Sequence, residues 1–198
     1  MAEGHILVAI ERENYWQCAY VIPKGGSFEV ELLGVDVLRR QIASIAPFLA
    51  NRVAELSTLQ QAKVLTVKVD RLREWARPGL LCIGDAAHAM SPIGGVGINL
   101  AIQDAVATSN LLSSILLSRS PTLAELRRVQ RRRERPTRLM QRLQVAIQNR
   151  VIQPVLEGAP TGVPAALRWL DRSVLLRRVT ARLMGMGFLP EHVQTRAA

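Results

Sequence analysis

One segment, GDAAHAMSPIGGVGIN at residues 84–99, limits what this chain can fold into more than any other part of it. It follows a short apolar run, GLLCIG at residues 79–84, and precedes a helical pattern of small and apolar residues over residues 97–117. A short, nearly pure apolar run is typical of a central strand buried on both faces. Glycines permit positive φ angles and a close approach of the backbone to a neighbour. The sequence therefore predicts a strand, a glycine-rich loop and a well-buried helix in succession.

Asp85 and the start of the predicted helix point to a ligand at this loop. The first N–H groups of a helix have no intrahelical acceptor, and they attract negative charge. Asp85 would repel a phosphate, but its carboxylate can accept hydrogen bonds from the hydroxyl groups of a sugar or polyol. The combination predicts a ligand with hydroxyl groups and an electron-rich ring or phosphate. A simpler interpretation, in which Asp85 only caps the strand end, stays open.

The segment at residues 84–105 resembles the second flavin-contacting motif of the FAD-dependent aromatic hydroxylases. These are the class A flavoprotein monooxygenases related to the para-hydroxybenzoate and ubiquinone-pathway hydroxylases. The matching positions are Gly84, Asp85, Ala86, Ala87, His88, Pro92, Gly94, Gly95, Gly97, Asn99, Asp104 and Ala105. The run WQCAYVIPKG also resembles a strand of the family's substrate-domain sheet. Nearly the whole chain is similar to the C-terminal half of such an enzyme.

The resemblance implies that NAD(P)H reduces FAD and that O2 then hydroxylates an aromatic or quinone-like substrate. Asp85 would hold the ribityl chain of FAD, and the turn at residues 92–95 would lie beside the isoalloxazine ring. Amides at residues 97–99 would face the N1/O2 edge of the flavin, where reduction places negative charge that a helix N-terminus stabilises. The implied cofactor-binding residues are Gly84, Asp85, Pro92, Gly94, Gly95, Val96, Gly97, Ile98 and Asn99.

The substrate-contacting residues are less clearly indicated. Trp16, Tyr20 and Pro92 are candidates for lining an aromatic substrate pocket, although aromatic strand residues more often belong to a core. His88 either relays a proton or, as we expect, orients the loop or packs against it. No catalytic side chain is implied, and the sequence shows no His/Cys cluster that would predict a metal site.

The family's other FAD-binding element, a strand followed by G-x-G-x-x-G and a helix, does not occur in these 198 residues. The expected fold class is mixed α/β: the C-terminal half of an FAD/NAD(P)-binding monooxygenase fold, with a partial substrate-domain β-sheet and C-terminal helices, without the N-terminal Rossmann part. We expect a remnant of the substrate-binding sheet domain at residues 1–78, the flavin-contacting unit at residues 79–118 and a helical region at residues 119–198. The expected partners are a missing N-terminal half, which would hold the NAD(P)H site, or a second copy in a homo-oligomer.

Three further strands follow from short β-rich runs and alternating apolar residues. Residues 5–10 and 16–22 are expected to pair in an antiparallel arrangement. Residues 63–70 alternate apolar and polar side chains and are expected to form another strand.

Three further helices follow from apolar residues at helical spacing. The first is expected over residues 35–48 and should break near Pro47. The second is expected over residues 122–150, where Pro136 should kink or interrupt it. The third is expected at about residues 165–184, after a loop at residues 158–164.

The charge of the chain leaves a second class of function open. With 26 Lys and Arg against 16 Asp and Glu, the formal net charge is +10, and seven arginines lie between Arg127 and Arg138. The lack of interleaved aromatic residues argues against a nucleic-acid site and favours a solvated helix face or a surface for a partner. The alternative function is therefore a non-enzymatic remnant or split-protein subunit that binds a partner through basic helices.

The N-terminus lacks the pattern of a signal peptide, and no apolar run reaches the roughly 18 residues that a membrane span needs. We therefore expect a cytoplasmic protein. Peripheral contact with a membrane through the helix at residues 165–184 is an open alternative to a lid or packing role for that helix.

Overall fold

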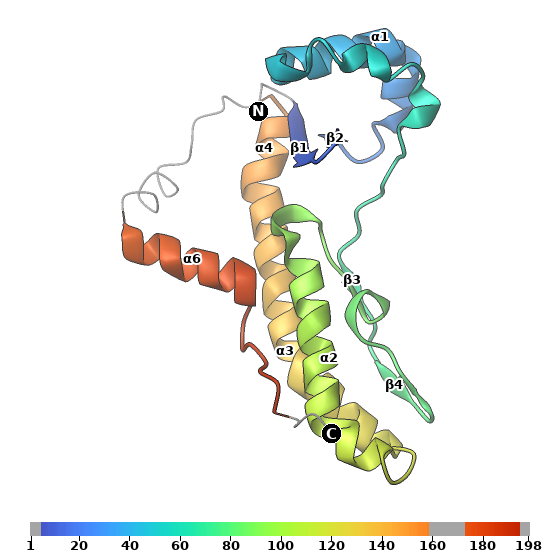
Figure 1. Cartoon of the computed structure of the whole chain (residues 1–198), viewed down its shortest axis with the longest axis vertical. Coiled ribbons are helices and arrows are strands. Elements are labelled where there is room, and N and C mark those ends of the chain that lie inside the picture. The colour runs from blue at the N-terminus through green and yellow to red at the C-terminus, as the bar shows by residue number, and fades with distance from the viewer. Residues whose placement is uncertain (1–4, 159–172, 195–198) are drawn as a thin grey trace. The chain divides into compact units, whose positions relative to one another are not determined.

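The computed structural model describes residues 5–158 and 173–194 of the chain. These residues form a mixed α/β structure, as the sequence predicted (Figure 1). They separate into two compact units, one of residues 5–66 with 147–158 and one of residues 67–146 with 173–194. Within the described ranges, every helix is too short or too polar to cross a lipid bilayer.

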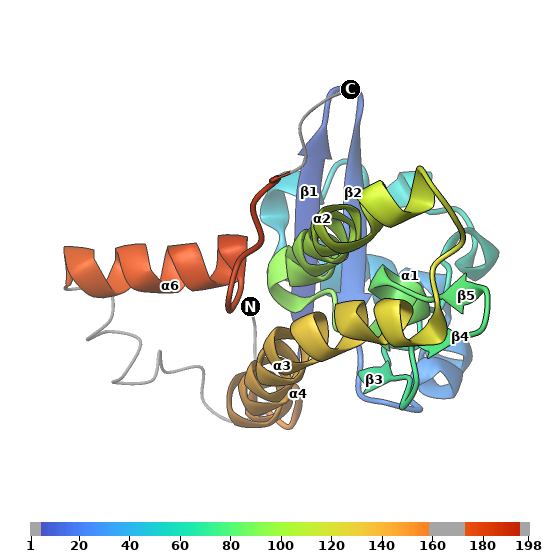
Figure 2. The ribbon, with the colours of Figure 1, turned by 90° about the horizontal axis from the view of Figure 1, so that it is seen from below.

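The first unit contains a β-hairpin. Strands β1 (Ile6–Arg12) and β2 (Tyr15–Val21) pair in antiparallel register from Ile6 opposite Val21 to Arg12 opposite Tyr15, which confirms the predicted pair (Figure 2). The Tyr20 hydroxyl lies 2.6 Å from His5 Nδ1 and donates to Gln41 Oε1 at 3.0 Å. Because Gln41 belongs to the following helix, this bond ties the hairpin to it.

That helix, α1, extends over Ser27–Ile45. It begins earlier than predicted, because Gly34 at φ 78° joins a short N-terminal helical piece to the predicted one. It ends before Pro47, as expected, and the 3-10 turns η1 (Pro47–Leu49), η2 (Val53–Glu55) and η3 (Leu59–Gln61) follow. The segments η6 (Gln148–Ile152) and α4 (Gln153–Leu156) complete the first unit.

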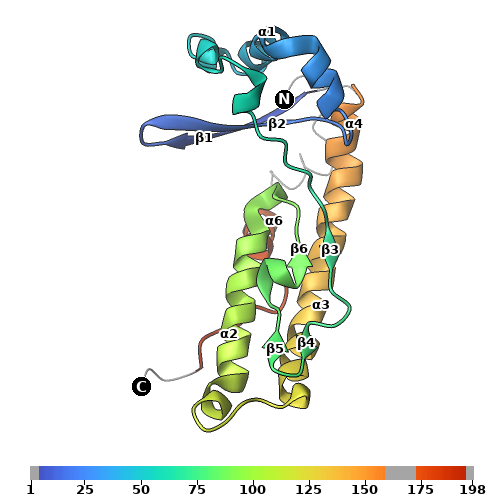
Figure 3. The same cartoon turned by 90° about the vertical axis from the view of Figure 1, so that its right-hand side faces the viewer.

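Two long helices form the framework of the second unit. Helices α2 (Val96–Leu116) and α3 (Leu123–Ile147) lie side by side (Figure 1, Figure 3). Two apolar clusters join them, and their buried members are Ala76, Leu112, Leu126 and Val129 in one and Val96, Leu100 and Met140 in the other. Helix α2 is buried on only one face, since Ile98 is 69% exposed and Ile102 is 56% exposed. The predicted helix is therefore present but less buried than expected.

The third predicted helix is present in part. Helix α6 (Val174–Met186) packs its C-terminal end against the second apolar cluster through Met184. The earlier part of that prediction, and most of the loop predicted at residues 158–164, lie outside the described residues.

Two strand predictions are wrong. Residues 64–69 have no regular structure, and only β3 (Asp70–Arg71) pairs, with β6 (His88–Ala89). The apolar run at residues 79–84 is no central strand: β5 (Leu80–Leu81) forms a short hairpin with β4 (Ala76–Arg77), and Leu80 is 55% exposed. A buried strand needs hydrogen-bonding neighbours on both sides, and the described residues of this unit supply only these two-residue partners.

Of the two predicted effects of Pro136 on α3, a kink or an interruption, the interruption does not occur. The helix is continuous through this residue, which is itself buried. A proline inside a helix costs about 3 kcal/mol through a lost hydrogen bond and a steric clash. Buried residues on both sides of it, from Leu126 to Gln144, hold α3 in place and offset that cost.

Candidate functional site

The glycine-rich segment folds as a series of tight turns in the second unit. The 3-10 turn η4 (Gly84–Ala86) leads to β6, and the turn η5 (Ile93–Gly95) leads directly into α2. Gly84, Gly94 and Gly95 have φ angles of 58°, 77° and 63°, in the left-handed region that favours glycine. A Cβ at Gly84 would lie 3.0 Å from the Ala101 side chain, and a Cβ at Gly94 would overlap the Met184 side chain.

The N-terminus of α2 has no side-chain cap among the described residues. Gly95 occupies the N-cap position in a left-handed conformation, and no side chain accepts a hydrogen bond from the cap. No acidic residue lies in the first turn, and a Cβ at Gly95 would meet open space. The positive end of the helix dipole is therefore not neutralised by an acidic side chain of that turn.

Asp85 lies exposed in η4, and Pro92, Gly94 and Gly95 are exposed as well. Among the described residues, the Asp85 carboxylate has no hydrogen-bond or ion-pair partner, so its oxygens are available as acceptors. The structure thus brings an accessible carboxylate and an uncapped helix N-terminus into neighbouring turns of one unit. Val96 is buried and anchors the helix start, whereas Gly97 and Asn99 are half-buried.

A buried polar network lies beneath this loop. The Asp104 carboxylate accepts hydrogen bonds from the Gly84 amide at 3.0 Å and from His88 Nε2 at 2.6 Å, both on Oδ2. Its other oxygen, Oδ1, accepts from Arg133 Nε at 2.9 Å. The exposed fractions of Asp104, Arg133 and His88 are 0%, 0% and 1%, so water does not screen these contacts. His88 is thus buried and oriented against the loop, as expected.

The charge state of Asp104 follows from its partners. Burial alone would raise the pKa of this carboxyl, but hydrogen bonds from His88, Arg133 and the Gly84 amide outweigh it, and the pKa lies below its ordinary value. Because an ionised carboxylate only accepts hydrogen bonds, His88 Nε2 carries the proton in their contact.

Arg133 also connects the network to the C-terminal segment. Its Nη1 donates to the Leu189 carbonyl at 3.3 Å, and its Nη2 donates to Gln103 Oε1 at 3.2 Å. Gln103 Nε2 donates in turn to the Met186 carbonyl at 2.6 Å. The neighbouring Arg132 forms a two-bond ion pair with Glu191, at 2.6 and 2.9 Å.

The role of Arg133 corrects the prediction of a solvated arginine face. The other arginines of the run are exposed, but Arg133 is fully buried. Six similar residues surround it in the sequence, but only Arg133 is buried: it lies four residues after Val129 and seven before Met140, on the apolar face of α3. Asp104 offers a clearer indication, since it is the only charged residue in α2 and a lone carboxylate on an apolar helix requires a buried partner.

Two of the three candidate substrate residues, Trp16 and Tyr20, lie in the first unit, and the third, Pro92, is exposed in the second. Trp16 is half-buried, with its ring centroid 5.1 Å from that of Phe48. Tyr20 is also half-buried and bonds within its own unit, as described above. A role for either residue in substrate binding stays a prediction.

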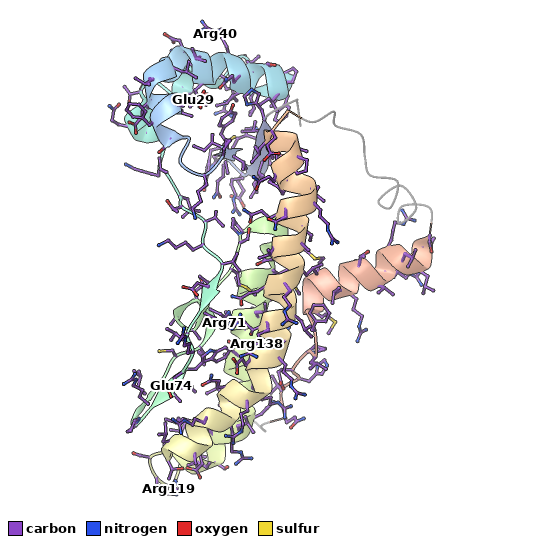
Figure 4. All side chains as sticks on the ribbon, turned by 180° about the vertical axis from the view of Figure 1, so that it is seen from behind. Glu29, Arg40, Arg71, Glu74, Arg119 and Arg138 are labelled. Atoms are coloured by element: carbon purple, nitrogen blue, oxygen red, sulfur yellow. The ribbon has the colours of Figure 1, made fainter. Side chains whose placement is uncertain are left out.

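The second unit also has an open hollow of about 610 Å3 between β3 and α3. Arg71 and Arg138 line it from the two sides and lie near each other in Figure 4. None of the residues at positions 84–99 lines this hollow. In the part of the chain that the structure describes, no three His, Cys, Asp or Glu residues lie close enough together to hold a metal ion.

Comparisons with known proteins agree with the resemblance of the loop. Residues 3–143 match the family described as "FAD binding domain". The chain is 34% identical to 6-methylpretetramide 4-monooxygenase of Streptomyces rimosus over 168 residues, which are 84% of this chain and 40% of that protein.

Two fungal relatives match shorter stretches. The FAD-dependent monooxygenase idtM of Claviceps paspali is 50% identical over 46 residues, which are 23% of this chain and 9% of that protein. The FAD-dependent monooxygenase olcE of Penicillium canescens is 32% identical over 74 residues, 35% of this chain and 16% of that protein. The chain thus corresponds to less than half the length of each of these relatives.

Proposed function

Because the chain belongs to the FAD binding domain family, whose cofactor is FAD, we propose that residues 84–99 form the flavin-ring side of an FAD site. The observation that carries the proposal is that Asp85 is exposed and the N-terminus of α2 is uncapped, neither having a side-chain partner among the described residues. The Asp85 carboxylate suits the hydroxyl groups of the ribityl chain. The N-terminus of α2 suits the edge of the flavin ring that gains negative charge on reduction.

Different residues of the loop would contact different parts of FAD. Asp85 would accept hydrogen bonds from ribityl hydroxyls, and the amides of Gly97 and Ile98, which have no acceptor within the helix, would meet the electron-rich edge of the ring. Asn99 is also a proposed contact, but its amide is the first to bond within α2, to the carbonyl of Gly95. Pro92, Gly94 and Gly95 are exposed in the turn that leads into α2, and a flat ring could lie against the backbone of the two glycines. Gly84 and Val96, both buried, would anchor the loop on either side of His88 and Pro92. FAD, when bound, supplies the redox chemistry that the side chains of the loop lack.

The proposed reaction is hydroxylation of an aromatic or quinone-like substrate with NAD(P)H and O2. Its support is the likeness to 6-methylpretetramide 4-monooxygenase and to several FAD-dependent monooxygenases. Trp16, Tyr20 and Pro92 are the proposed substrate contacts. We further propose that the chain corresponds to the C-terminal, flavin-ring part of such an enzyme, because these 198 residues contain no G-x-G-x-x-G.

Titration of the purified chain with FAD, followed by flavin fluorescence and absorbance, tests the proposal. We expect saturable binding that Asp85→Ala weakens about tenfold or more, through loss of hydrogen bonds to a charged acceptor. Glu74→Ala is the matched control, because Glu74 is an exposed carboxylate of the same unit outside the loop. The proposal fails if the wild-type chain binds no FAD, or if both substitutions weaken binding equally.

The alternative function has one structural observation in its favour. Four arginines on the exposed surface of α3 have no ion-pair partner among the described residues: Arg128, Arg131, Arg135 and Arg142. They would suit an acidic partner. Tight binding of such a partner that weakens steeply with salt, together with no binding of FAD, would support this alternative.

A further inference from the structure

We propose that Asp104 is a positioning residue for the flavin loop: it fixes the turn that presents Asp85, and Arg133 ties this turn to the C-terminal segment. The inference rests on the proposed function for its effect on FAD, but its structural part can be measured without the cofactor. Asp104 is fully buried, so it acts through other residues and not by contact with a ligand.

The first step concerns the turn itself. Gly84 is buried with φ at 58°, and its amide donates to Asp104 Oδ2 at 3.0 Å. Asp85 is the next residue along the chain, so the direction of its exposed carboxylate depends on the peptide plane that this hydrogen bond holds. Loss of the bond would leave a buried amide without its acceptor and free the turn to rotate.

The second step concerns the carboxylate of Asp104. All three of its partners are donors: the Gly84 amide, His88 Nε2 and Arg133 Nε. An asparagine at this position would have one acceptor oxygen and an NH2 group that faces at least one of these donors. Only a carboxylate satisfies the three contacts together, which explains why a charged residue lies on an otherwise uncharged helix.

Asp104 makes more hydrogen bonds than the pairing of α2 with α3 requires. Apolar clusters already join α2 and α3. If Asp104 served only to strengthen this helix pair, its ion pair with Arg133 would be sufficient. The additional bonds reach specifically into the loop, one to the backbone at Gly84 and one to His88. The hydrogen bonds of Asp104 therefore connect α2 to the turn at Gly84 as well as to α3.

The fourth step adds the C-terminal segment. Leu189 is the only non-glycine residue with a positive φ in the described ranges, at 51°, and its carbonyl accepts from Arg133. Such a conformation is costly for a leucine and persists only where its surroundings hold it. Arg133 thus restrains this segment and the Asp85 turn through the same guanidinium group.

A double-mutant cycle on FAD affinity tests the positioning role. We expect Asp104→Asn to weaken FAD binding about tenfold, and we expect this effect to vanish when Asp85 is already alanine, because Asp104 acts through Asp85. Leu126→Ala, a core substitution in the same unit, is the control, and its effect should combine additively with Asp85→Ala. Additive effects of Asp104→Asn and Asp85→Ala would overturn the proposal.

Amide hydrogen exchange gives a second readout that needs no FAD. We expect Asp104→Asn to increase the exchange rate at residues 84–88 more than the exchange rate at Val129. Leu126→Ala should increase the exchange rates of both regions by the same factor. Arg133→Lys keeps a charged donor, and as a milder variant it should shift exchange in the same direction. If wild-type chain binds no FAD, the proposed function fails and exchange alone decides the positioning role. Equal changes in the two regions would contradict it.

Discussion

At the scale of single residues, the loop contains positions whose backbone conformation and surroundings allow few substitutes. Gly94 is one of them. Its φ of 77° is unfavourable for any residue with a Cβ, and a Cβ there would overlap the Met184 side chain. The backbone conformation therefore favours glycine at this position, and a Cβ would also displace the flexible end of the Met184 side chain.

We therefore expect Gly94→Ala to lower the free energy of unfolding by about 1–3 kcal/mol, from backbone strain and displacement of Met184. Gly185→Ala is the matched control on α6. A Cβ there would meet nothing within 4 Å, so a helix-favouring residue should stabilise by about 0.5–1 kcal/mol. Thermal and denaturant unfolding measure both effects. Equal effects of the two substitutions would show that the loop is not packed against α6 as described.

The acid stability of the chain should also depend on single carboxylates. The pKa of Asp104 is lowered, so its ionised form stabilises the fold above the unfolded-state value of about 4, and this contribution is lost as the pH falls through the lower folded-state pKa. In the Asp104→Asn variant, the free energy of unfolding should therefore decrease less steeply below about pH 4 than in the wild-type chain. Urea unfolding between about pH 2 and pH 7 measures it.

The ion pair of the half-buried Glu125 with the exposed Arg119 provides the comparison. Hydrogen bonds from Arg119 and Thr122 lower the pKa of Glu125 to about 2. Its contribution to acid stability has the same sign, but salt should weaken it, because ions screen exposed charges. The contribution of the buried Asp104 should persist in high salt. Equal salt sensitivity of the two contributions would contradict the buried network.

At the scale of elements, helices could be predicted from the sequence and most strands could not. The helical spacing of apolar residues in α2 and α3 is visible within each segment, and the apolar face that it defines is the face that packs against the other helix. Strand pairing depends on residues elsewhere in the chain, so the alternation at residues 63–70 and the apolar run at residues 79–84 gave wrong predictions. The hairpin of β1 and β2 is the exception, because its two strands are adjacent in the sequence.

The site followed the same division. The sequence indicates the exposed residues of the candidate site, because Asp85 and the glycines belong to one continuous motif, and their role in binding FAD stays a prediction. The buried support was not predicted, because Asp104, Arg133 and Leu189 come from distant segments. Position 133 follows the helical spacing of the buried residues Val129 and Met140, but that spacing does not reveal Asp104 as its partner.

The contact between α2 and α3 is the main apolar stabilisation of the second unit. We expect Leu126→Ala, which removes a side chain that is 6% exposed, to lower the free energy of unfolding by about 2–4 kcal/mol. Leu139→Ala on the same helix is the control, since Leu139 is 40% exposed and should cost about 1 kcal/mol or less. Denaturant unfolding of both variants measures the difference, and similar losses would mean that the helix pair is not held by this face.

At the scale of the whole molecule, the central claim is that this chain provides the flavin-ring side of an FAD site. The family match covers residues 3–143, and the loop at residues 84–99 presents acceptors and donors suited to the ribityl chain and the ring. The net charge of +10 is a competing feature, because a basic surface attracts many anions without specificity. The decisive measurement must therefore separate the flavin half of FAD from its anionic ADP half.

Competition against bound FAD makes that separation. Riboflavin carries the ring and ribityl chain without phosphate, whereas ADP carries the adenine and phosphates without the ring. We predict that riboflavin displaces FAD from the purified chain with an affinity within about tenfold of that of FAD, and that ADP does not displace it. Displacement by ADP but not by riboflavin would contradict the claim that residues 84–99 hold the flavin ring.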